Sequence, residues 1–359
     1  MSANRLEMHN ISLAFSGFQA LNKVDFTLHG GSVHALTGAN GAGKSTLMAV
    51  LCGTHAHYEG EVTINNLPVT IRSPRDAKQL GIHLVQQEVD VALVPGLSIA
   101  ENIMLDRLAE PGMTFRWSRV RQLAREALAQ LDVALDVRRS IDSCTLAEKQ
   151  QILLARALSH HCRFLILDEP TASLDTQEVE LLFDLMRQLR DRGVSLIFVT
   201  HFLDQVYQVS DRITVLRNGS FVGCRETCEL PQIELVKMML GRELDTHALQ
   251  RAGRTLLSDK PVAAFKNYGK KGTIAPFDLE VRPGEIVGLA GLLGSGRTET
   301  AEVIFGIKPA DSGTALIKGK PQNLRSPHQA SVLGIGFCPE DRKTDGIIAA
   351  ASVRENIIL

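Results

Sequence analysis

The chain has 359 residues, of which 44% are apolar and 22% are charged, with 39 Lys and Arg against 40 Asp and Glu. This length is too great for one ordinary hydrophobic core and predicts two domains, and the composition excludes a disordered chain. The charge balance argues against nucleic acid as a partner, and no run approaches 18 apolar residues, so we expect no nucleic-acid binding and no membrane span.

The first chemical motif along the chain is a glycine-rich loop that begins at Gly38. Its sequence, GANGAGKS, matches GxxxxGK[ST] and lies between an apolar strand pattern, SVHALTG, and a helical pattern, TLMAVLCG. Such a unit binds phosphate because glycines let successive N–H groups point at the anion and the helix start is positive. We predict that Lys44 holds the outer phosphates of a nucleotide and that Ser45 offers its hydroxyl to Mg²⁺. The alternative is a glycine-rich turn with a surface lysine. The predicted phosphate-binding residues are Gly38, Asn40, Gly41, Gly43, Lys44, Ser45 and Thr46.

Two apolar strand patterns further along the chain end in polar residues. FLILD ends at Asp168 and is followed by Glu169, and SLIFVT is followed by His201. We predict that Asp168 holds Mg²⁺, directly or through water, and that Glu169 polarises the attacking water. His201, at the end of a parallel strand, should contact the outermost phosphate. The alternatives are solvated acids at a strand end and a structural histidine.

The chain also repeats itself with an offset of 253 residues. GANGAGKST at Gly38 recurs as GLLGSGRTE at Gly291, and RSPRDAKQLGI recurs as RSPHQASVLGI. At the same offset Phe15 matches Tyr268, and SIAENIML recurs later as SVRENIIL. A period this long indicates whole domains and not solenoid repeats.

The repeat sets the expected domain boundaries. We expect a first domain over residues 1–244, a linker over 245–261 and a second copy over 262–359 that carries only the N-terminal part of the domain. By the repeat, this second copy lacks counterparts of the acidic strand and the histidine strand. A strand expected over Glu285–Ala290 would then have no neighbours, so its backbone groups would stay unpaired and we expect this part to be unstable.

Together these motifs resemble the nucleotide-binding subunits of ABC transporters. The glycine loop, Gln87 in LVQQE, LILDEP, the following SLD and His201 occur in that family's order and approximate spacing. PEDRKTDG and MLGREL are similar to the duplicated ATPases of bacterial monosaccharide importers, and the stretch from TASLDTQEVELLFDL is similar to the galactofuranose type. The resemblance implies an α/β P-loop NTPase fold in tandem copies, each with a RecA-like parallel sheet and with antiparallel β and helical subdomains.

The resemblance also implies a function. The chain would bind ATP and Mg²⁺ and couple ATP hydrolysis to a conformational change of permease subunits at the cytoplasmic face of the bacterial inner membrane. A periplasmic sugar-binding protein would be a partner through the complex. The alternatives are a soluble ABC ATPase that acts on ribosomes or DNA without a permease, and a nucleotide-binding remnant without turnover. The short, mixed linker favours the importer, because the non-transport proteins tend to have a long charged spacer.

Further residues are assigned by position in the family. Phe15 would stack on adenine, Gln87 would sense the γ-phosphate beside the metal and report to the permease, and Asp175 would contact the opposite domain. Residues 88–143 would form the helical subdomain that faces the permease. The family's signature loop, LSGGQ, aligns with Cys144–Gln150, where a threonine keeps the hydroxyl and an alanine replaces a glycine, which should weaken the phosphate contact. The predicted signature residues are Thr145, Ala147, Glu148 and Gln150.

The second glycine loop departs from the family pattern. Arg297 stands where a lysine is expected, and its bulkier, planar side chain has a different geometry. In this family the glycine loop of one domain closes on the signature loop of the other, so the second loop should bind nucleotide and hydrolyse it poorly. The competent site would need a signature loop from the second copy, which would lie beyond Leu359, so we expect low turnover. The predicted second-site residues are Tyr268, Gly291, Gly296, Arg297 and Thr298.

Overall fold

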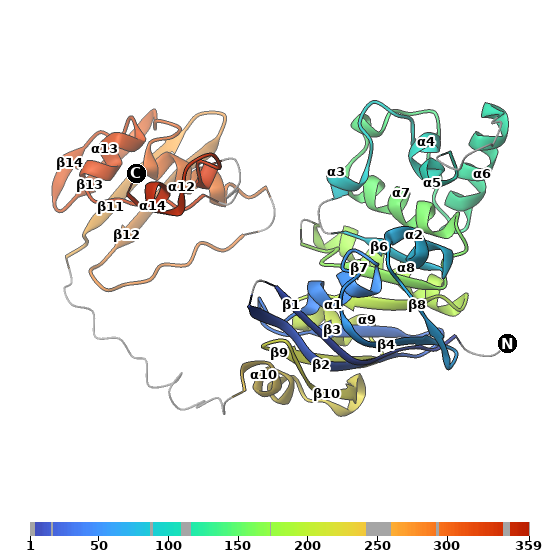
Figure 1. Cartoon of the computed structure of the whole chain (residues 1–359). Coiled ribbons are helices and arrows are strands. Elements are labelled where there is room, and N and C mark those ends of the chain that lie inside the picture. Colours follow the sequence, from blue (N-terminus) through green and yellow to red (C-terminus); the bar gives the residue numbers. More distant parts are fainter. Residues whose placement is uncertain are drawn as a thin grey trace. The chain divides into compact units, whose positions relative to one another are not determined.

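Figure 1 shows the computed structural model of the chain, which describes residues 4–15, 17–86, 89–108, 116–172, 174–241, 260–291, 294–339 and 345–358. The chain divides into two compact units, Met1–Leu244 and Asp245–Leu359. Within the described residues, the first unit contains two sheets and a group of helices, and the second contains one sheet and short helices.

The first unit mixes strands and helices along the chain, as expected for an α/β fold. Its strands are β1 Leu6–Phe15, β2 Phe18–Leu28, β3 Val33–Thr37, β4 Glu59–Ile64, β5 Leu67–Val69, β6 Ile82–Val85, β7 Phe164–Asp168, β8 Ser195–Val199, β9 Arg212–Arg217 and β10 Ser220–Glu226. Its helices are α1 Lys44–Leu51, α2 Pro74–Gln79, α3 Val89–Ala92, α4 Ile99–Ile103, α5 Leu105–Leu108, α6 Trp117–Ala129, α7 Leu146–Leu158, α8 Thr176–Asp191, α9 Leu203–Val209 and α10 Gln232–Leu240, with 3-10 turns at Ile141–Ser143 and Thr227–Glu229.

A six-stranded sheet forms the centre of the first unit, in the order β10-β9-β3-β8-β7-β6. The strands from β9 to β6 are parallel, and β10 is antiparallel to β9. Strands β3 and β8 are buried along their whole length, as expected for a parallel sheet covered on both faces. Successive residues of β8 serve opposite faces, because Leu196 and Phe198 join one hydrophobic cluster and Ile197 and Val199 join the other.

Different layers cover the two faces of this sheet. The cluster that contains Phe198 is built with helices α4, α6, α7 and α8. The cluster that contains Ile197 is built with α1 and with a four-stranded antiparallel sheet in the order β2-β1-β4-β5. Figure 1 shows α4, α6 and α7 gathered above the strands of the first unit. The expected fold class, a parallel sheet with antiparallel β and helical subdomains, is confirmed for the first unit.

The second unit repeats part of this architecture. Its elements are β11 Ala263–Lys270, β12 Ile274–Val281, α12 Arg297–Phe305, β13 Ser312–Ile317, β14 Lys320–Gln322, α13 Pro327–Val332 and α14 Val353–Ile358. The sheet order β12-β11-β13-β14 corresponds to β2-β1-β4-β5. Both copies of the SxxENI motif also fold alike, because Asn102 and Asn356 each bond the backbone of the preceding loop and Ser98 and Ser352 each bond a glutamate three residues on.

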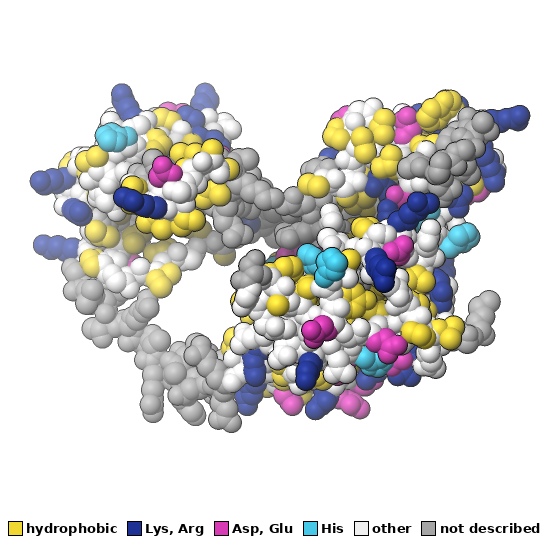
Figure 2. All heavy atoms as spheres, in the orientation of Figure 1, with side chains coloured by type: hydrophobic (Ala, Val, Ile, Leu, Met, Phe, Trp, Pro, Cys, Tyr) yellow, Lys and Arg dark blue, Asp and Glu magenta, His cyan; other side chains and the backbone are white. Residues whose placement is uncertain are grey.

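The strand expected before the second glycine loop is absent. Residues 285–290 are described and form no strand, whereas the matching β3 is central to the first unit. Ile286 is 80% exposed and Leu289 is 47% exposed. Figure 2 shows apolar side chains among the Lys and Arg side chains on the surface of the second unit. Among the helices that the structure describes, none has the length and apolar character needed to cross a bilayer.

Candidate nucleotide-binding site

The glycine loop connects the end of β3 to the start of α1, as the sequence indicates. Gly38 has a φ of 151°, and a Cβ built on it would lie 2.3 Å from the carbonyl oxygen of Leu216, so a side chain cannot be accommodated there. Gly43 has a φ of 99° and forms the N-cap of α1, which has no side-chain cap. The first N–H groups of α1 are therefore not capped by a side chain, and they sit where the helix end attracts an anion.

Lys44 is the first residue of α1, and it is buried to 7% exposure. Its Nζ donates hydrogen bonds to the carbonyl oxygens of Gly38 at 2.8 Å and Ala39 at 3.1 Å. The ammonium group is thus folded back across the loop that the phosphates would enter. Burial lowers the pKa of Lys44, and the nearby carboxylates of Glu169 and Asp168 partly offset this shift.

The two acids stand where β7 ends, beside the glycine loop. Burial raises the pKa of the Asp168 carboxyl group, Glu169 adds to this shift, and the Ser45 hydroxyl and Lys44 oppose it. Glu169 itself has a φ of 47°, in the left-handed region, and its N–H donates to the carbonyl oxygen of Val199 in β8 at 2.8 Å. A strained backbone is typical of functional positions, because only the surrounding structure holds it.

His201 lies just beyond the end of β8, on the same edge of the sheet. Its Nδ1 is 3.2 Å from Oε1 of Glu169. The structure therefore brings Lys44, Ser45, Asp168, Glu169 and His201 together, as their places at parallel strand ends indicate. Their individual roles stay predictions.

A pocket of about 390 Å³ opens beside this group. Phe15 is 41% exposed at its rim, and its ring meets that of His55 edge-on at 5.0 Å between centroids. Phe18, which is 68% exposed, also lines the pocket. Sequence reasoning missed Phe18 and His55, although Phe18 follows Phe15 closely in the same hairpin and could have been found there. The lining residues are Phe15, Phe18, Ala20, Asn40, Gly41, Ala42, Gly43, Lys44, Ser45, Thr46 and Glu169.

Several predicted positions fall outside this pocket or outside the described residues. Gln87 and Ser173 lie outside the described residues, as do parts of PEDRKTDG and MLGREL. Asp175 is the N-cap of α8 and forms a capping box with Glu178. The predicted roles of these residues therefore stay predictions.

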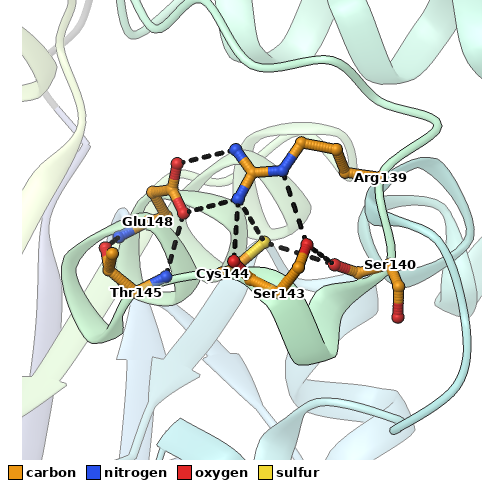
Figure 3. A network of polar contacts seen from close by, with 6 residues as sticks. All are labelled: Arg139, Ser140, Ser143, Cys144, Thr145 and Glu148. Atoms are coloured by element: carbon orange, nitrogen blue, oxygen red, sulfur yellow. Dashed lines mark hydrogen bonds and ion pairs between the residues drawn. The ribbon is translucent and has the colours of Figure 1, made fainter.

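The signature loop of the first unit forms the start of α7. Thr145 is the N-cap, and it exchanges hydrogen bonds with Glu148 in a capping box. Figure 3 shows Arg139 reaching across to Glu148 from the preceding loop. Gln150 is buried, and its Nε2 donates to the carbonyl oxygen of Pro170 at 2.5 Å, so it ties α7 to the segment after Glu169.

The prediction for Tyr268 is corrected by the structure. Its ring is buried and packs against Phe265 and Phe277 at 5.2 Å and 6.2 Å between centroids. The matching hydrogen bonds that cross the two hairpins join residues 15 apart in the first unit, from Asn10 to Asp25, but 11 apart in the second. The hairpin of the second unit is therefore four residues shorter, and Tyr268 occupies the place of a buried residue of β1 and not that of Phe15.

The second glycine loop keeps part of the geometry of the first. Gly296 is a left-handed N-cap and Arg297 is the first residue of α12, as Gly43 and Lys44 are for α1. Arg297 and Thr298 are exposed, in contrast to the buried Lys44. Gly291 lies close to the Ser295 side chain, which a Cβ at Gly291 would meet at 2.3 Å. Among the residues that the structure describes in this unit, no strand carries counterparts of Asp168, Glu169 or His201.

Comparisons with known proteins agree with this geometry. A family model for ABC transporters matches residues 21–172. The chain is 70% identical over 354 residues to the galactofuranose transporter ATP-binding protein YtfR of Escherichia coli K12. The aligned part covers 99% of this chain and 70% of that protein. It is 41% identical over 357 residues to the fructose import ATP-binding protein FruK of Bifidobacterium longum, and that alignment covers 98% of this chain and 69% of that protein.

Solved structures share the fold. The ATP-binding cassette MJ1267 of an ABC transporter, in its ADP conformation, superposes with a TM-score of 0.59 and 22% identity over 67% of this chain and 99% of that chain. At this identity the likeness shows the fold alone. The similarity to the bacterial relatives extends over almost the whole chain and is far stronger. The chain therefore belongs to the ATP-binding proteins of ABC transporters.

Proposed function

We propose that this chain is the ATP-binding and ATP-hydrolysing subunit of a bacterial sugar importer, and that the sugar is galactofuranose. The observation that carries the proposal is the 70% identity over 354 residues to a galactofuranose transporter ATP-binding protein, against 41% to a fructose import protein. The site geometry supports the ATP part of the proposal, because the glycine loop, the buried lysine and Glu169 line one pocket, and Asp168 directly precedes Glu169 at the end of β7.

The residues at the strand ends fit a bound Mg²⁺. Burial raises the pKa of the Asp168 carboxyl group, the Ser45 hydroxyl is near enough to lower that pKa, and a divalent cation would stabilise the ionised form. Ser45 and Asp168 would hold the metal, and Gln87 would be a further ligand. When bound, Mg²⁺ would neutralise charge on the outer phosphates of ATP.

The remaining groups divide the chemistry among them. Lys44 would leave the carbonyl oxygens of its own loop and bind the outer phosphates, and Phe15 would stack on the adenine. Glu169 would orient and polarise the attacking water, and His201 would hold the outermost phosphate next to it. The contact of 3.2 Å between His201 and Glu169 keeps these two groups at the same point.

The partners follow from the transporter family. Permease subunits in the inner membrane would dock on the helical subdomain of residues 88–143, which includes α4 and α6, and a periplasmic sugar-binding protein would join through them. The chain would act at the cytoplasmic face of the membrane. Two chains that pair through their first units would close each site with the altered loop Cys144–Gln150, so turnover by such a pair should be low.

A nucleotide titration tests the ATP part of the proposal. In the full chain, Lys44→Ala should abolish most Mg-ATP binding. The control is Lys78→Ala, which should leave binding unchanged, because Lys78 pairs with Asp106 and does not line the pocket. Unchanged ATP affinity in Lys44→Ala would refute the assignment of the site.

A separate experiment tests the sugar. The chain should co-purify with the permease subunits of the galactofuranose transporter of Escherichia coli and not with those of a ribose transporter from the same organism. Equal capture by both, or preference for the ribose permease, would reject galactofuranose and leave the ATP-binding assignment intact.

A further inference from the structure

The loop before α7 is closed by a network centred on Arg139 (Figure 3). The guanidinium donates from Nη1 to Oε1 of Glu148 at 2.9 Å and from Nη2 to Oε2 at 3.0 Å, which is a two-pronged ion pair. Nη2 also donates to the carbonyl oxygen of Ser143 at 2.9 Å and lies 3.8 Å from Sγ of Cys144. Most of the donors of Arg139 are therefore used within the loop that leads into the signature residues.

Glu148 is at the same time bonded to the start of the helix. Its Oε2 accepts from the N–H of Thr145 at 2.9 Å, and its own N–H donates to Oγ1 of Thr145 at 3.2 Å. These are groups that the N-terminus of α7 would otherwise offer to a phosphate. The contrast with α1 is clear, because α1 begins after Gly43 and has no side-chain cap.

We propose that Arg139 is a positioning residue that holds Glu148 folded over the start of α7, so that the signature loop of the first unit is closed by its own side chains and the carboxylate of Glu148 is neutralised. The proposal rests on the proposed function, in which this loop faces the outer phosphate of a nucleotide bound to an opposing glycine loop. A phosphate that approaches the loop meets a carboxylate where the family norm has an uncharged glutamine, and Arg139 cancels the repulsion.

Two substitutions should therefore have opposite effects. Glu148→Gln removes the negative charge and keeps the capping box, because glutamine can make the same bonds, so closure of the loop on phosphate should strengthen. Arg139→Gln leaves the carboxylate of Glu148 without its partner, so closure should weaken. A purely structural role of the pair predicts weaker closure for both variants, since either change removes the ion pair between Arg139 and Glu148.

The double variant separates charge from packing further. Arg139→Gln together with Glu148→Gln removes both charges of the ion pair and should recover much of what Arg139→Gln alone loses. Arg139→Lys should rescue in part, because lysine restores the charge but not the two-pronged geometry. The matched control is Asp142→Asn, which removes one negative charge from the same loop, where Asp142 accepts from the N–H of Gly96 and does not contact the capping box.

The assay is the Mg-ATP-dependent self-association of the full chain, measured by sedimentation in a Glu169→Gln background that slows hydrolysis. Each glycine loop then closes on the Cys144–Gln150 loop of the other copy. We expect Glu148→Gln to tighten association by about fivefold and Arg139→Gln to weaken it by about fivefold, in line with the energy of a partly exposed ion pair. Both effects should decrease at high salt, and Asp142→Asn should change association by less than about twofold.

A second measurement needs no association. Hydrogen exchange of the Thr145 and Glu148 amides should be slow in the free chain and faster in Arg139→Gln, because that change loosens the carboxylate that accepts from Thr145. Equal exchange in the parent chain and in Arg139→Gln overturns the proposal. A change of association in the same direction for Glu148→Gln and Arg139→Gln also overturns it, as does the absence of ATP-dependent association in every variant. If the parent chain does not bind a fluorescent ATP analogue, the proposed function itself is rejected.

Discussion

Lowering the pH from 7 to 5 should destabilise the first unit, and His34 should account for about 2 kcal/mol of this loss. His34 lies in β3 and is fully buried. Its Nε2 contacts the Thr214 hydroxyl at 2.8 Å, and its Nδ1 has no hydrogen-bond partner among the described residues. Burial lowers the pKa of His34 to about 3, with smaller contributions from Arg212 and His29.

The magnitude follows from the proton that the unfolded chain takes up. The unfolded imidazole has its ordinary pKa of 6.5, whereas the folded one stays neutral until the pH falls to about 3. Because the unfolded state binds more protons in this window, the free energy of unfolding decreases as the pH falls from about 6.5 towards 3. Between pH 7 and 5 the difference is about 2 kcal/mol for one such group. His83, whose pKa is lowered to about 4 by burial, acts in the same direction.

Urea unfolding at the two pH values measures this loss. Trp117, the one tryptophan of the chain, lies in α6 and reports on the first unit by fluorescence. His34→Gln keeps an amide for Thr214 and cannot take up a proton, so the loss between pH 7 and 5 should shrink by about 2 kcal/mol, whatever its stability at pH 7. The exposed His57→Gln serves as the control and should leave the loss unchanged. The same pH dependence in His34→Gln as in the parent chain would show that His34 is not the buried neutral group.

Three further outcomes test the site and the second unit. Phe15→Ala should weaken ATP binding by roughly five- to tenfold in a fluorescent-nucleotide titration. Tyr268→Ala should leave the ATP affinity unchanged and should lower the melting temperature of the second unit in calorimetry. The reverse pattern would show that Tyr268 binds the nucleotide. Gly38→Ala should abolish ATP binding and destabilise the first unit by more than about 2 kcal/mol, and Gly41→Ala, where a Cβ meets no atom within 4 Å, should cost only the roughly 1–2 kcal/mol of a left-handed residue. Limited proteolysis should cut first near residues 286–290, and a resistant fragment that spans the whole second unit would contradict this.

The parts of the site that local sequence determines could be predicted. A glycine loop between strand and helix patterns gives the position of Lys44, and an apolar run that ends in acids gives those of Asp168 and Glu169. Parallel strands end at one edge of the sheet, so His201 could be added without knowing the strand order. The contact between His201 and Glu169, the burial of Lys44 and the left-handed backbone of Glu169 depend on packing across β3, β7 and β8, which no short motif encodes.

The Tyr268 prediction failed for a reason that is physical and not statistical. A constant offset of 253 residues pairs Tyr268 with Phe15, but the hairpin between β11 and β12 is shorter than that between β1 and β2. Tyr268 therefore lies within the sheet and not at the exposed end of the hairpin. Side chains alternate between the two faces of a strand, and register decides which face a residue occupies. Arg139 was missed for a related reason, because its partner Glu148 lies nine residues away and is reached only through the fold of the intervening loop.

Residues 286–290 resemble β3 in sequence but differ from it in structure. IVGLA has the same short, apolar strand pattern as VHALT in β3, and both precede a glycine loop and a helix. VHALT is a buried strand because β8 and β9 pair with its two edges and both faces are covered. Within the described part of the second unit no strand pairs with residues 286–290, and this segment stays extended into solvent with Ile286 80% exposed. The apolar pattern supplies side chains that could be buried, but hydrogen bonds from neighbouring strands make the strand, so identical local signals give a core element in one unit and an exposed segment in the other.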